Sequence, residues 1–172
     1  MSAIRGNSCY KIVNGPSWSE AEANAAKLGG HLVSINDEDE NIYVWENLGK
    51  AASYKGGDHN NYKSNHVFIG ATDRGQEGVW EWLDGSRMSF SNWIPGQPDN
   101  ASWHGSPVKS EDFIAYLEVE NSDQTNGAWF DIRDEYYKEQ ASGSYMYGIA
   151  EIPISSSISF SKTPQEGAGN FT

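Results

Sequence analysis

The chain has only one cysteine, Cys9, among its 172 residues. A single cysteine excludes a disulfide within the chain, and it excludes the zinc sites that several thiolates build. A chain of this length buries roughly two thirds of the surface that its unfolded form exposes, so its core can form without cross-links. We therefore expect one globular domain, with or without a short appendage.

Basic residues and long apolar runs are also scarce. The chain holds 12 Lys and Arg against 24 Asp and Glu, a formal net charge of −12. This balance argues against nucleic acid, because few cations are available to neutralise phosphates, and against anionic membranes. No apolar run approaches the roughly 18 residues of a membrane helix, so we expect no membrane insertion. Residues 1–6 lack the apolar segment of a signal peptide.

Known catalytic motifs are missing as well. The four histidines show no His-Glu-x-x-His spacing, and no Gly-x-Ser-x-Gly sequence occurs. Gly49-Lys50 lacks the Ser or Thr that follows in a phosphate-binding loop. The sequence therefore predicts a protein that is not an enzyme.

Aromatic residues and glycines are abundant instead, with 7 Trp, 9 Tyr, 6 Phe and 18 Gly. This composition is typical of a loop-rich globular domain with an aromatic core. We expect four tryptophans to lie in that core: Trp80, Trp82, Trp93 and Trp129.

Two helices are predicted near the start of the chain. Ser17 and Glu20 form a capping-box pattern before a helix over residues 18–28, which Gly29-Gly30 ends. A second helix is capped by Asn36 or Asp37 and ends at Gly49. Apolar residues at i, i+3 and i+6 predict its buried face: Ile42, Trp45 and Leu48.

The strand predictions cover most of the remaining apolar segments, namely residues 8–13, 31–35, 67–71, 79–82, 113–119, 128–132 and 145–152. Between them, residues 91–110 have no regular period, and so long a loop in a compact domain is usually functional or disordered. After Pro153 the composition shifts to Ser, Thr and Gly. The predicted domain therefore covers residues 1–153, and residues 154–172 are a linker or the first strand of a following domain.

Oxygen-bearing side chains surround the long loop. Gln97 and Asp99 flank Pro98, and a cis bond before that proline would direct both side chains to one place. Glu111 ends the loop, and Asp131 lies on the next predicted strand. Carboxylate and amide oxygens are the ligands that Ca²⁺ prefers, at a coordination number of 6–8. These four residues therefore predict a calcium site with positions left for ligand hydroxyls.

These motifs, taken in order, resemble those of a C-type lectin-like domain over residues 8–153. The stretches that carry the resemblance are Trp18-Ser19-Glu20-Ala21, residues 28–35 (LGGHLVSI), Phe68-Ile69-Gly70-Ala71, Gln97-Pro98-Asp99, Glu111-Asp112 and Trp129-Phe130-Asp131. Each stretch alone is weak evidence, whereas six in order are strong. The resemblance implies an α+β fold with two helices, small antiparallel sheets and a long calcium-binding loop.

The resemblance also implies roles for the acidic residues. A sugar-binding calcium site would use Gln97, Asp99, Glu111 and Asp131, and the Gln-Pro-Asp triplet implies galactose-type sugars or related terminal sugars such as fucose. An auxiliary calcium site would use a second set: Asp73, Glu77, Asn100 and Asp112. Each assignment has a simpler alternative. In one, the Gln-Pro-Asp triplet forms only a turn; in the other, Asp73 and Glu77 are solvated acids of a surface loop.

Two aromatic positions bear on the sugar. Galactose-type members of the family place a Trp in this loop, and Trp103 lies four residues after Asp99. The axial 4-hydroxyl of galactose leaves a continuous C–H face that an indole can cover. Trp103 either stacks on the sugar in this way or packs on the side chains of its own loop. His104 is the histidine expected to face the ligand.

The chain departs from the family pattern in two places. Phe130 stands where the family usually has an Asn ligand, which puts the strength of calcium binding in question. The four framework half-cystines are absent, and their positions correspond to Ala25 with Ala150 and to Phe113 with about Asp134. Such cysteine-poor versions resemble bacterial or phage proteins.

The sequence thus predicts a non-enzymatic, Ca²⁺-dependent carbohydrate-binding module, extracellular and part of a cell-surface adhesin with neighbouring domains. Two alternatives stay open. One is a protein- or peptide-binding module whose calcium only shapes its loop, and the other is an ice-binding variant of the same fold.

Overall fold

A computed structural model describes residues 1–56, 66–101, 111–117, 127–134 and 146–154 of the chain. The helical elements are α1 (Trp18–Lys27), α2 (Glu38–Val44), the π-helical segment η1 (Trp45–Gly49) and α3 (Lys50–Gly56). The strands are β1 (Ser2–Arg5), β2 (Ser8–Asn14), β3 (His31–Leu32), β4 (His66–Thr72), β5 (Glu81–Trp82), β6 (Phe113–Leu117), β7 (Trp129–Ile132) and β8 (Tyr147–Pro153).

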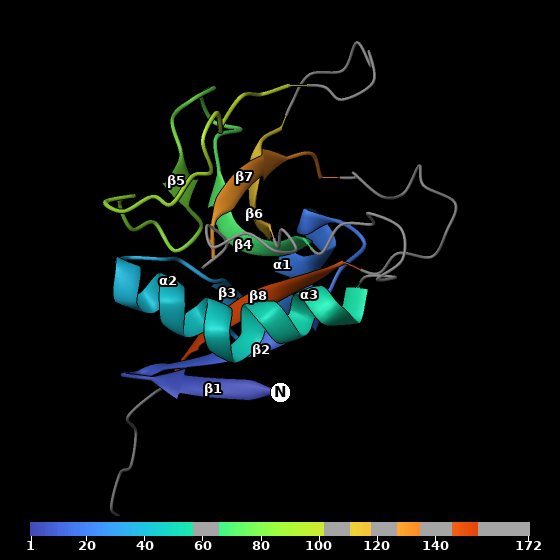
Figure 1. The fold of residues 1–172 in the computed structure, drawn as a ribbon. Helices are drawn as coiled ribbons and strands as arrows, with labels where there is room; N and C mark the ends of the chain where they lie inside the picture. Colours follow the sequence, from blue (N-terminus) through green and yellow to red (C-terminus); the bar gives the residue numbers. More distant parts are fainter. Residues whose placement is uncertain (57–65, 102–110, 118–126, 135–145, 155–172) are drawn as a thin grey trace, which may run out of the picture.

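The strands form one mixed sheet in the order β1-β2-β8-β4-β6-β7, with β3 added to β8 and β5 added to β4. The described pairings are antiparallel except between β4 and β8, where Val67 lies opposite Tyr147 in a parallel register. Figure 1 shows β6 and β7 at one end of the molecule, and β1 and β2 at the other. The α+β class is confirmed, although the sheet is larger and less purely antiparallel than expected.

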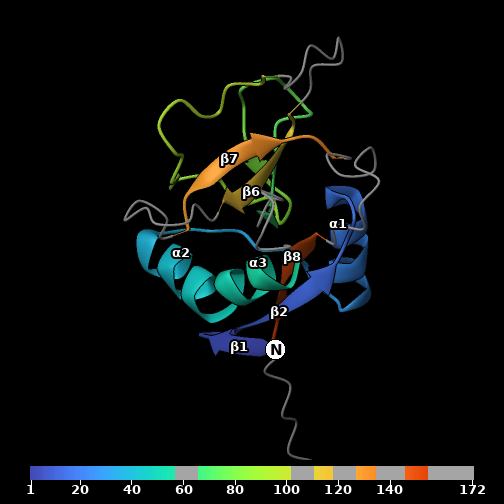
Figure 2. The same ribbon diagram turned by 45° about the vertical axis from the view of Figure 1, so that its right-hand side comes forward.

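Helices cover both faces of the sheet, and each face has its own apolar cluster. In β4, Val67 and Ile69 belong to one cluster while Phe68 belongs to the other, as the two-residue period of a strand requires. The α2–α3 segment packs in the first cluster through Trp45, and α1 packs in the second through Trp18. Figure 2 shows the two helical segments on opposite sides of β2 and β8.

The first helix follows the sequence closely. The Ser17 hydroxyl accepts a hydrogen bond from the backbone N–H of Glu20 at 3.2 Å, which satisfies one of the free donors at the helix start. Its C-cap is Leu28, and Gly29 follows with φ +84°, the left-handed conformation that glycine adopts at little cost. Ser17 and the glycine pair therefore set both ends of α1 as predicted.

The second helix does not end at Gly49, which corrects the prediction. The chain continues through η1 into α3 without a break. An added Cβ at Gly49 would overlap the indole of Trp45, so this glycine allows close packing rather than a helix end. Ile42 is 41% exposed, because the buried face runs instead through Asn41, Val44, Trp45 and Leu48.

The site of one missing disulfide is occupied by other contacts. Phe113, a position that the family pattern gives to a half-cystine, stacks on Trp18 with ring centroids 4.3 Å apart. Asp134, its expected partner position, accepts hydrogen bonds from the N–H and the hydroxyl of Ser19 at 2.8 and 2.7 Å. Ala25 and Ala150, the other pair, are fully buried in one cluster. Packing and hydrogen bonds thus connect α1 to the sheet in the absence of cross-links.

The edge of the sheet holds the first and last described segments together. The β1 strand, which the sequence did not predict, pairs antiparallel with β2. At the same end, the N–H of Ile154 donates to the carbonyl of Asn7 at 2.7 Å. No helix among the described residues is both long enough and apolar enough to cross a lipid bilayer.

Candidate functional site

The candidate site lies at the β6–β7 end of the molecule, where the loop after β5 runs along β7. Trp93 forms an isolated parallel bridge with Trp129. The N–H of Ile94 donates to the carbonyl of Trp129 at 2.9 Å, and the N–H of Trp129 donates to the carbonyl of Asn92 at 2.8 Å. The buried side chain of Trp129 is itself fixed in the core, since its indole N–H donates to Asn41 Oδ1 at 2.9 Å. The loop is therefore attached to the core two residues before Asp131.

The tryptophans expected in the core lie around this attachment. Trp82 and Trp129 are buried, while Trp80 and Trp93 are partly buried and pack against the same cluster. The rings of Trp82 and Trp93 meet Trp129 edge to face, at centroid distances of 5.8 and 5.9 Å. This cluster gives the loop a rigid base.

The Gln97–Pro98 peptide bond is cis, the condition under which Gln97 and Asp99 were expected to approach one place. Gln97 Oε1 accepts a hydrogen bond from the N–H of Asp131 at 3.2 Å. The N–H of Asp99 lies 3.2 and 3.1 Å from the two carboxylate oxygens of Asp131. The loop and β7 are thus joined through the side chains that the sequence assigned to one site.

Three carboxylates converge at this point. Asp99, Glu111 and Asp131 each offer one oxygen, and the three oxygens lie within 4.8 Å of one another. Asp99 is exposed, whereas Glu111 and Asp131 are 7% and 2% exposed. The set therefore has two buried carboxylates at its base and one at the surface.

Backbone donors hold the set in place. Asp131 also accepts a hydrogen bond from the N–H of Asn100 at 2.7 Å, and Asn100 Oδ1 in turn accepts from the N–H of Glu111 at 3.1 Å. Asn100 has φ 47°, a left-handed conformation that asparagine tolerates better than most residues. Through this residue, the two ends of residues 100–111 are linked directly.

The pKa values reflect the crowding of negative charge. Burial, together with the charges of Asp131 and Asp99, raises the pKa of Glu111 to about 7. Burial also raises the pKa of Asp131, although the hydrogen bonds from Asn100 and Asp99 oppose this shift. Carboxylates that repel one another at neutral pH are stabilised by a cation placed between them.

The chemistry of this set fits Ca²⁺. Three carboxylates are hard oxygen donors, and Gln97 adds an amide oxygen at the same place. Among the described residues, Asp99, Glu111 and Asp131 are the only group whose ligand atoms come this close. We therefore name Asp99, Glu111 and Asp131 the compact set.

The second group of acids is looser. Asp73 is 3% exposed, and its Oδ2 accepts from the N–H of Gly78 at 2.8 Å. Its Oδ1 is buried and makes no hydrogen bond to the described residues. Partial desolvation, followed by the charges of Asp73 and Asp112, raises the pKa of the exposed Glu77. We name Asp73, Glu77 and Asp112 the loose set.

Two neighbours of Asp131 matter for the site. Phe130, in place of the family Asn, packs toward the α1 cluster and places its ring 4.4 Å from that of His66. Arg133 lies near enough to Glu111 to lower its pKa, an effect smaller than those of burial and the two aspartates. Arg133 was not among the residues predicted from the sequence, and it follows β7 directly, two positions after Asp131.

Several predicted positions fall outside the described residues. Trp103 and His104 lie in residues 102–110, and the proposed linker is described only at Ile154. Their predicted roles therefore stay predictions.

Comparison with known proteins identifies the class. The family model of the lectin C-type domain matches residues 14–140, and the chain belongs to this family of carbohydrate-binding proteins. Membership in a lectin family confirms the expectation that the chain is not an enzyme. The fold and the motif order thus lead to the same class.

Two relatives are identical to this chain at about a third of the aligned positions. A perlucin-like protein of Mytilus galloprovincialis is 36% identical over 96 residues, which are 55% of this chain and 56% of that protein. A C-type lectin galactose-binding isoform of Pseudechis porphyriacus is 30% identical over 117 residues, which are 66% of this chain and 68% of that protein. The chain thus spans about half the length of the first relative. The relatives are eukaryotic, so the expected bacterial or phage character finds no support.

Solved structures confirm the fold. The cow C-type carbohydrate-recognition domain of CD23 is 24% identical and covers 90% of this chain and 94% of its own, with a TM-score of 0.62. A calcium-independent type II antifreeze protein is 20% identical and covers 88% and 91%, with a TM-score of 0.63. The C-type lectin fold is therefore shared by proteins of different function.

Proposed function

We propose that this domain binds galactose-type terminal sugars, or related sugars such as fucose, through a Ca²⁺ ion held by the compact set and Gln97. The observation that carries the proposal is the convergence of three carboxylate oxygens within 4.8 Å of one another. A bound Ca²⁺ would supply open coordination positions for sugar hydroxyls. The chain's own residues hold the ion and orient the loop.

The Gln97-Pro98-Asp99 triplet supports the galactose-type preference, as does the similarity to a relative named as galactose-binding. In the proposal, Trp103 covers the apolar face of the sugar and His104 lies beside it. One chelated sugar with one stacked ring buries little area, so the affinity for a single sugar is expected to be weak. Several copies on one surface would raise the total affinity by multivalency.

The loose set, with Asn100, is proposed to hold an auxiliary Ca²⁺. Its support is the buried Asp73 Oδ1, which has no donor among the described residues and lies beside two further acids. A buried carboxylate oxygen without a partner is costly unless a cation or water reaches it. An ion here would stabilise the loop rather than contact the sugar.

An extracellular place on a cell surface, within a larger adhesin, belongs to the same proposal. Its support is the lectin family and the expected need for multivalent binding. The decisive experiment is one calorimetry series in which Ca²⁺ is titrated first, and galactose, fucose and mannose afterwards. We expect Ca²⁺ heat, then galactose or fucose heat, and none of these sugar heats in EDTA.

Two variants locate the binding. Asp99→Ala should abolish sugar binding, whereas Trp103→Ala should weaken it several-fold and leave Ca²⁺ binding intact. Asp39→Ala, an exposed acid outside both sets, is the matched control. Unchanged sugar affinity in Trp103→Ala would remove the stacking role.

The protein-binding alternative is favoured by Phe130, which turns to the core instead of offering an oxygen. A glycan array with and without EDTA separates the two functions. Protein binding without any Ca²⁺-dependent sugar signal would replace the lectin proposal with this alternative. The ice-binding alternative is favoured by the fold shared with an antifreeze protein, and a thermal-hysteresis measurement tests it.

A further inference from the structure

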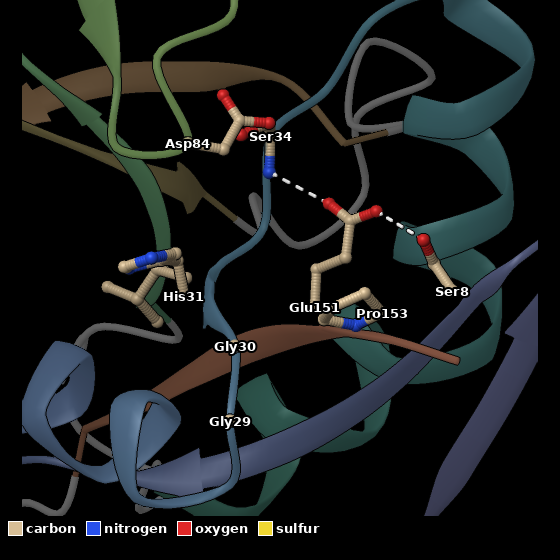
Figure 3. A pocket seen from close by; sticks show the side chains of 9 residues that line it. Ser8, Gly29, Gly30, His31, Ser34, Asp84, Glu151 and Pro153 are labelled. Atoms are coloured by element: carbon tan, nitrogen blue, oxygen red, sulfur yellow. Dashed lines mark hydrogen bonds between the residues drawn. The ribbon is translucent and has the colours of Figure 1, made fainter. Parts of the chain in front are cut away.

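A pocket of about 280 Å³ lies outside both acidic sets, between the end of α1, β3 and β8. None of its lining residues belongs to the candidate sugar site. Figure 3 shows Glu151 between Ser8 and Ser34, with the Asp84 carboxylate beside Ser34. A volume of this size suits a small molecule or a single side chain, since drug-sized ligands occupy about 300–1,000 Å³.

Two carboxylates line the pocket, those of Asp84 and Glu151, and two hydrogen bonds fix the position of Glu151. Glu151 accepts the Ser8 hydroxyl at 2.6 Å and the N–H of Ser34 at 3.4 Å. Among the described residues, the ion pairs within 4.0 Å include neither Glu151 nor Asp84. The nearest ring, His31, is paired with Glu22 at 2.7 Å. Among the described residues, two acids thus line one small space without an ion pair, although the charge of His31 helps to lower the pKa of Asp84.

A buried hydroxyl faces the same space. Ser34 is 1% exposed, and its Oγ makes no hydrogen bond within the described structure. Burial raises the pKa of the neighbouring Asp84, but Ser86 and then the Ser34 hydroxyl outweigh it, so the pKa of Asp84 is lowered. The N–H of Ser86 donates to Asp84 Oδ1 at 2.7 Å. A buried hydroxyl without a partner costs free energy that a bound polar group would recover.

The remaining wall is apolar. Pro153 and Leu32 line the pocket together with Gly29 and Gly30. Gly30 is held against β8 so tightly that an added Cβ would overlap the backbone of Glu151, which keeps this wall in place. Such a surface suits an alkyl chain next to a charged head group.

The pocket carries negative charge, which attracts cations. Burial raises the pKa of Glu151 despite the hydrogen bond from Ser8, and the charges of Glu40 and Asp84 raise it further. A positive group beside Glu151 and Asp84 would relieve this repulsion.

We propose that this pocket binds an organic cation, a primary ammonium or guanidinium group on a short alkyl stem. Its N–H donors would bond to Asp84 and Glu151, the Ser34 hydroxyl would accept another, and the stem would lie on Pro153. The cation belongs either to a free small amine or to a lysine or arginine side chain of another protein. Neither Ca²⁺ nor sugar is needed for this binding.

The test is an NMR titration of the full chain in EDTA, so that the result does not depend on the proposed lectin activity. The probes are n-butylammonium, methylguanidinium and the peptides Gly-Lys-Gly and Gly-Arg-Gly, with NaCl as the ionic-strength control. We expect saturable shifts of the amides of Gly30, Leu32, Ser34 and Asp84 with the cations. Tighter binding of a peptide than of its free analogue would assign the site to protein side chains, and equal binding would assign it to small amines.

Two variants remove one charge each, Asp84→Asn and Glu151→Gln, and each should raise the Kd of the cations by about tenfold or more. Glu81→Gln removes a charge from the exposed neighbouring strand β5 and should leave the Kd unchanged. If Glu151→Gln does not fold, Ser34→Ala, which spares both carboxylates, should still weaken binding several-fold. Shifts that fail to saturate, or an equal Kd in wild type and all pocket variants, would overturn the proposal.

Discussion

The compact and loose sets are both acidic, but they differ in how many of their oxygens the protein itself satisfies. Asp131 accepts backbone hydrogen bonds on both oxygens, whereas one oxygen of the buried Asp73 has no described partner. Three ligand atoms of the compact set lie within 4.8 Å, and the loose set does not reach this closeness. The comparison indicates that the fold organises the first set through its own hydrogen bonds, whereas it leaves one buried oxygen of the second set without a donor among the described residues.

The largest effect is expected when the same change is made in each set. Asp131→Asn should weaken the tightest Ca²⁺ binding by about 100-fold or more, because it removes a ligand charge and an acceptor for the loop. Asp73→Asn should weaken that binding less than about tenfold. Calcium titration by calorimetry measures both, with Asp39→Asn as the control. Equal losses in the two variants would end the distinction between the sets.

Calcium removal should have the next largest effect. Ca²⁺ at about 100 times its Kd stabilises a folded protein by about 2.7 kcal/mol, or about 5–10 °C in Tm for a chain of this size. Thermal unfolding followed by circular dichroism, with and without EDTA, measures the difference. The difference should shrink most in Asp131→Asn, which leaves only the contribution of the loose set, and shrink less in Asp73→Asn. A Tm that does not respond to Ca²⁺ in the wild type would argue against both sites.

The calcium affinity of the compact set should also depend on pH, because this set contains Glu111. Because the pKa of Glu111 is raised to about 7, protons compete with Ca²⁺ below that pH. Calcium affinity should therefore fall as the pH drops through 7, by at most about tenfold per unit for this one group. Glu111→Gln should abolish the dependence and weaken binding at every pH. Calorimetric titrations at pH 5.5, 6.5 and 7.5 test this, and a flat profile in the wild type would contradict it.

The metal-free protein should show the opposite trend. A carboxyl whose pKa is higher in the folded than in the unfolded state favours folding below the unfolded value of 4.5, and this contribution is lost as the pH rises through about 7. In EDTA, the free energy of unfolding should therefore decline from pH 4.5 to 7. Glu111→Gln should flatten that decline in urea titrations, whereas Glu46→Gln, in an exposed pair with Lys50, should not.

The smallest effect is expected at the loose set without metal. Asp73→Asn removes one of the charges that raise the pKa of Glu77, so in EDTA the variant should unfold about 1–2 °C higher than the wild type. The NMR titration of Glu77 should show a lower pKa at the same time. A decrease in Tm would mean that the buried Asp73 carboxylate stabilises the fold through its bond to Gly78, even without an ion.

The sequence predicted those parts of the fold that depend on local signals. Ser17 and Glu20 mark the start of α1 because capping is a contact between residues three positions apart. Gly49 misled the prediction because it lies one helical turn after Trp45 and leaves room for the indole within a continuous helix, whereas a glycine after an apolar run usually indicates a helix end. Asn41 was missed because a polar residue is not expected on the buried face of a helix. There its amide donates to the carbonyl of Gly127 and accepts a hydrogen bond from the indole N–H of Trp129.

The candidate site was more accessible to sequence reasoning than the second helix. The order of Gln97, Asp99, Glu111 and Asp131 indicated a shared centre, because oxygen ligands recur there in a recognisable family pattern. The pattern could not show that Asn100 connects the loop to Glu111, or that Asp73 Oδ1 has no hydrogen-bond partner in the described part of the chain. Such details depend on distances between segments that are remote in the chain.

The bond between Ile154 and Asn7 has a practical consequence for display of the domain. It brings the first strand and the last described residue to one end of the molecule, while β6 and β7 lie toward the opposite end (Figure 1). A tether attached at Met1 would therefore place the candidate site at the end of the domain away from the support. A biotin at Met1 should yield an immobilised layer whose capacity for ligand does not depend on the length of the spacer.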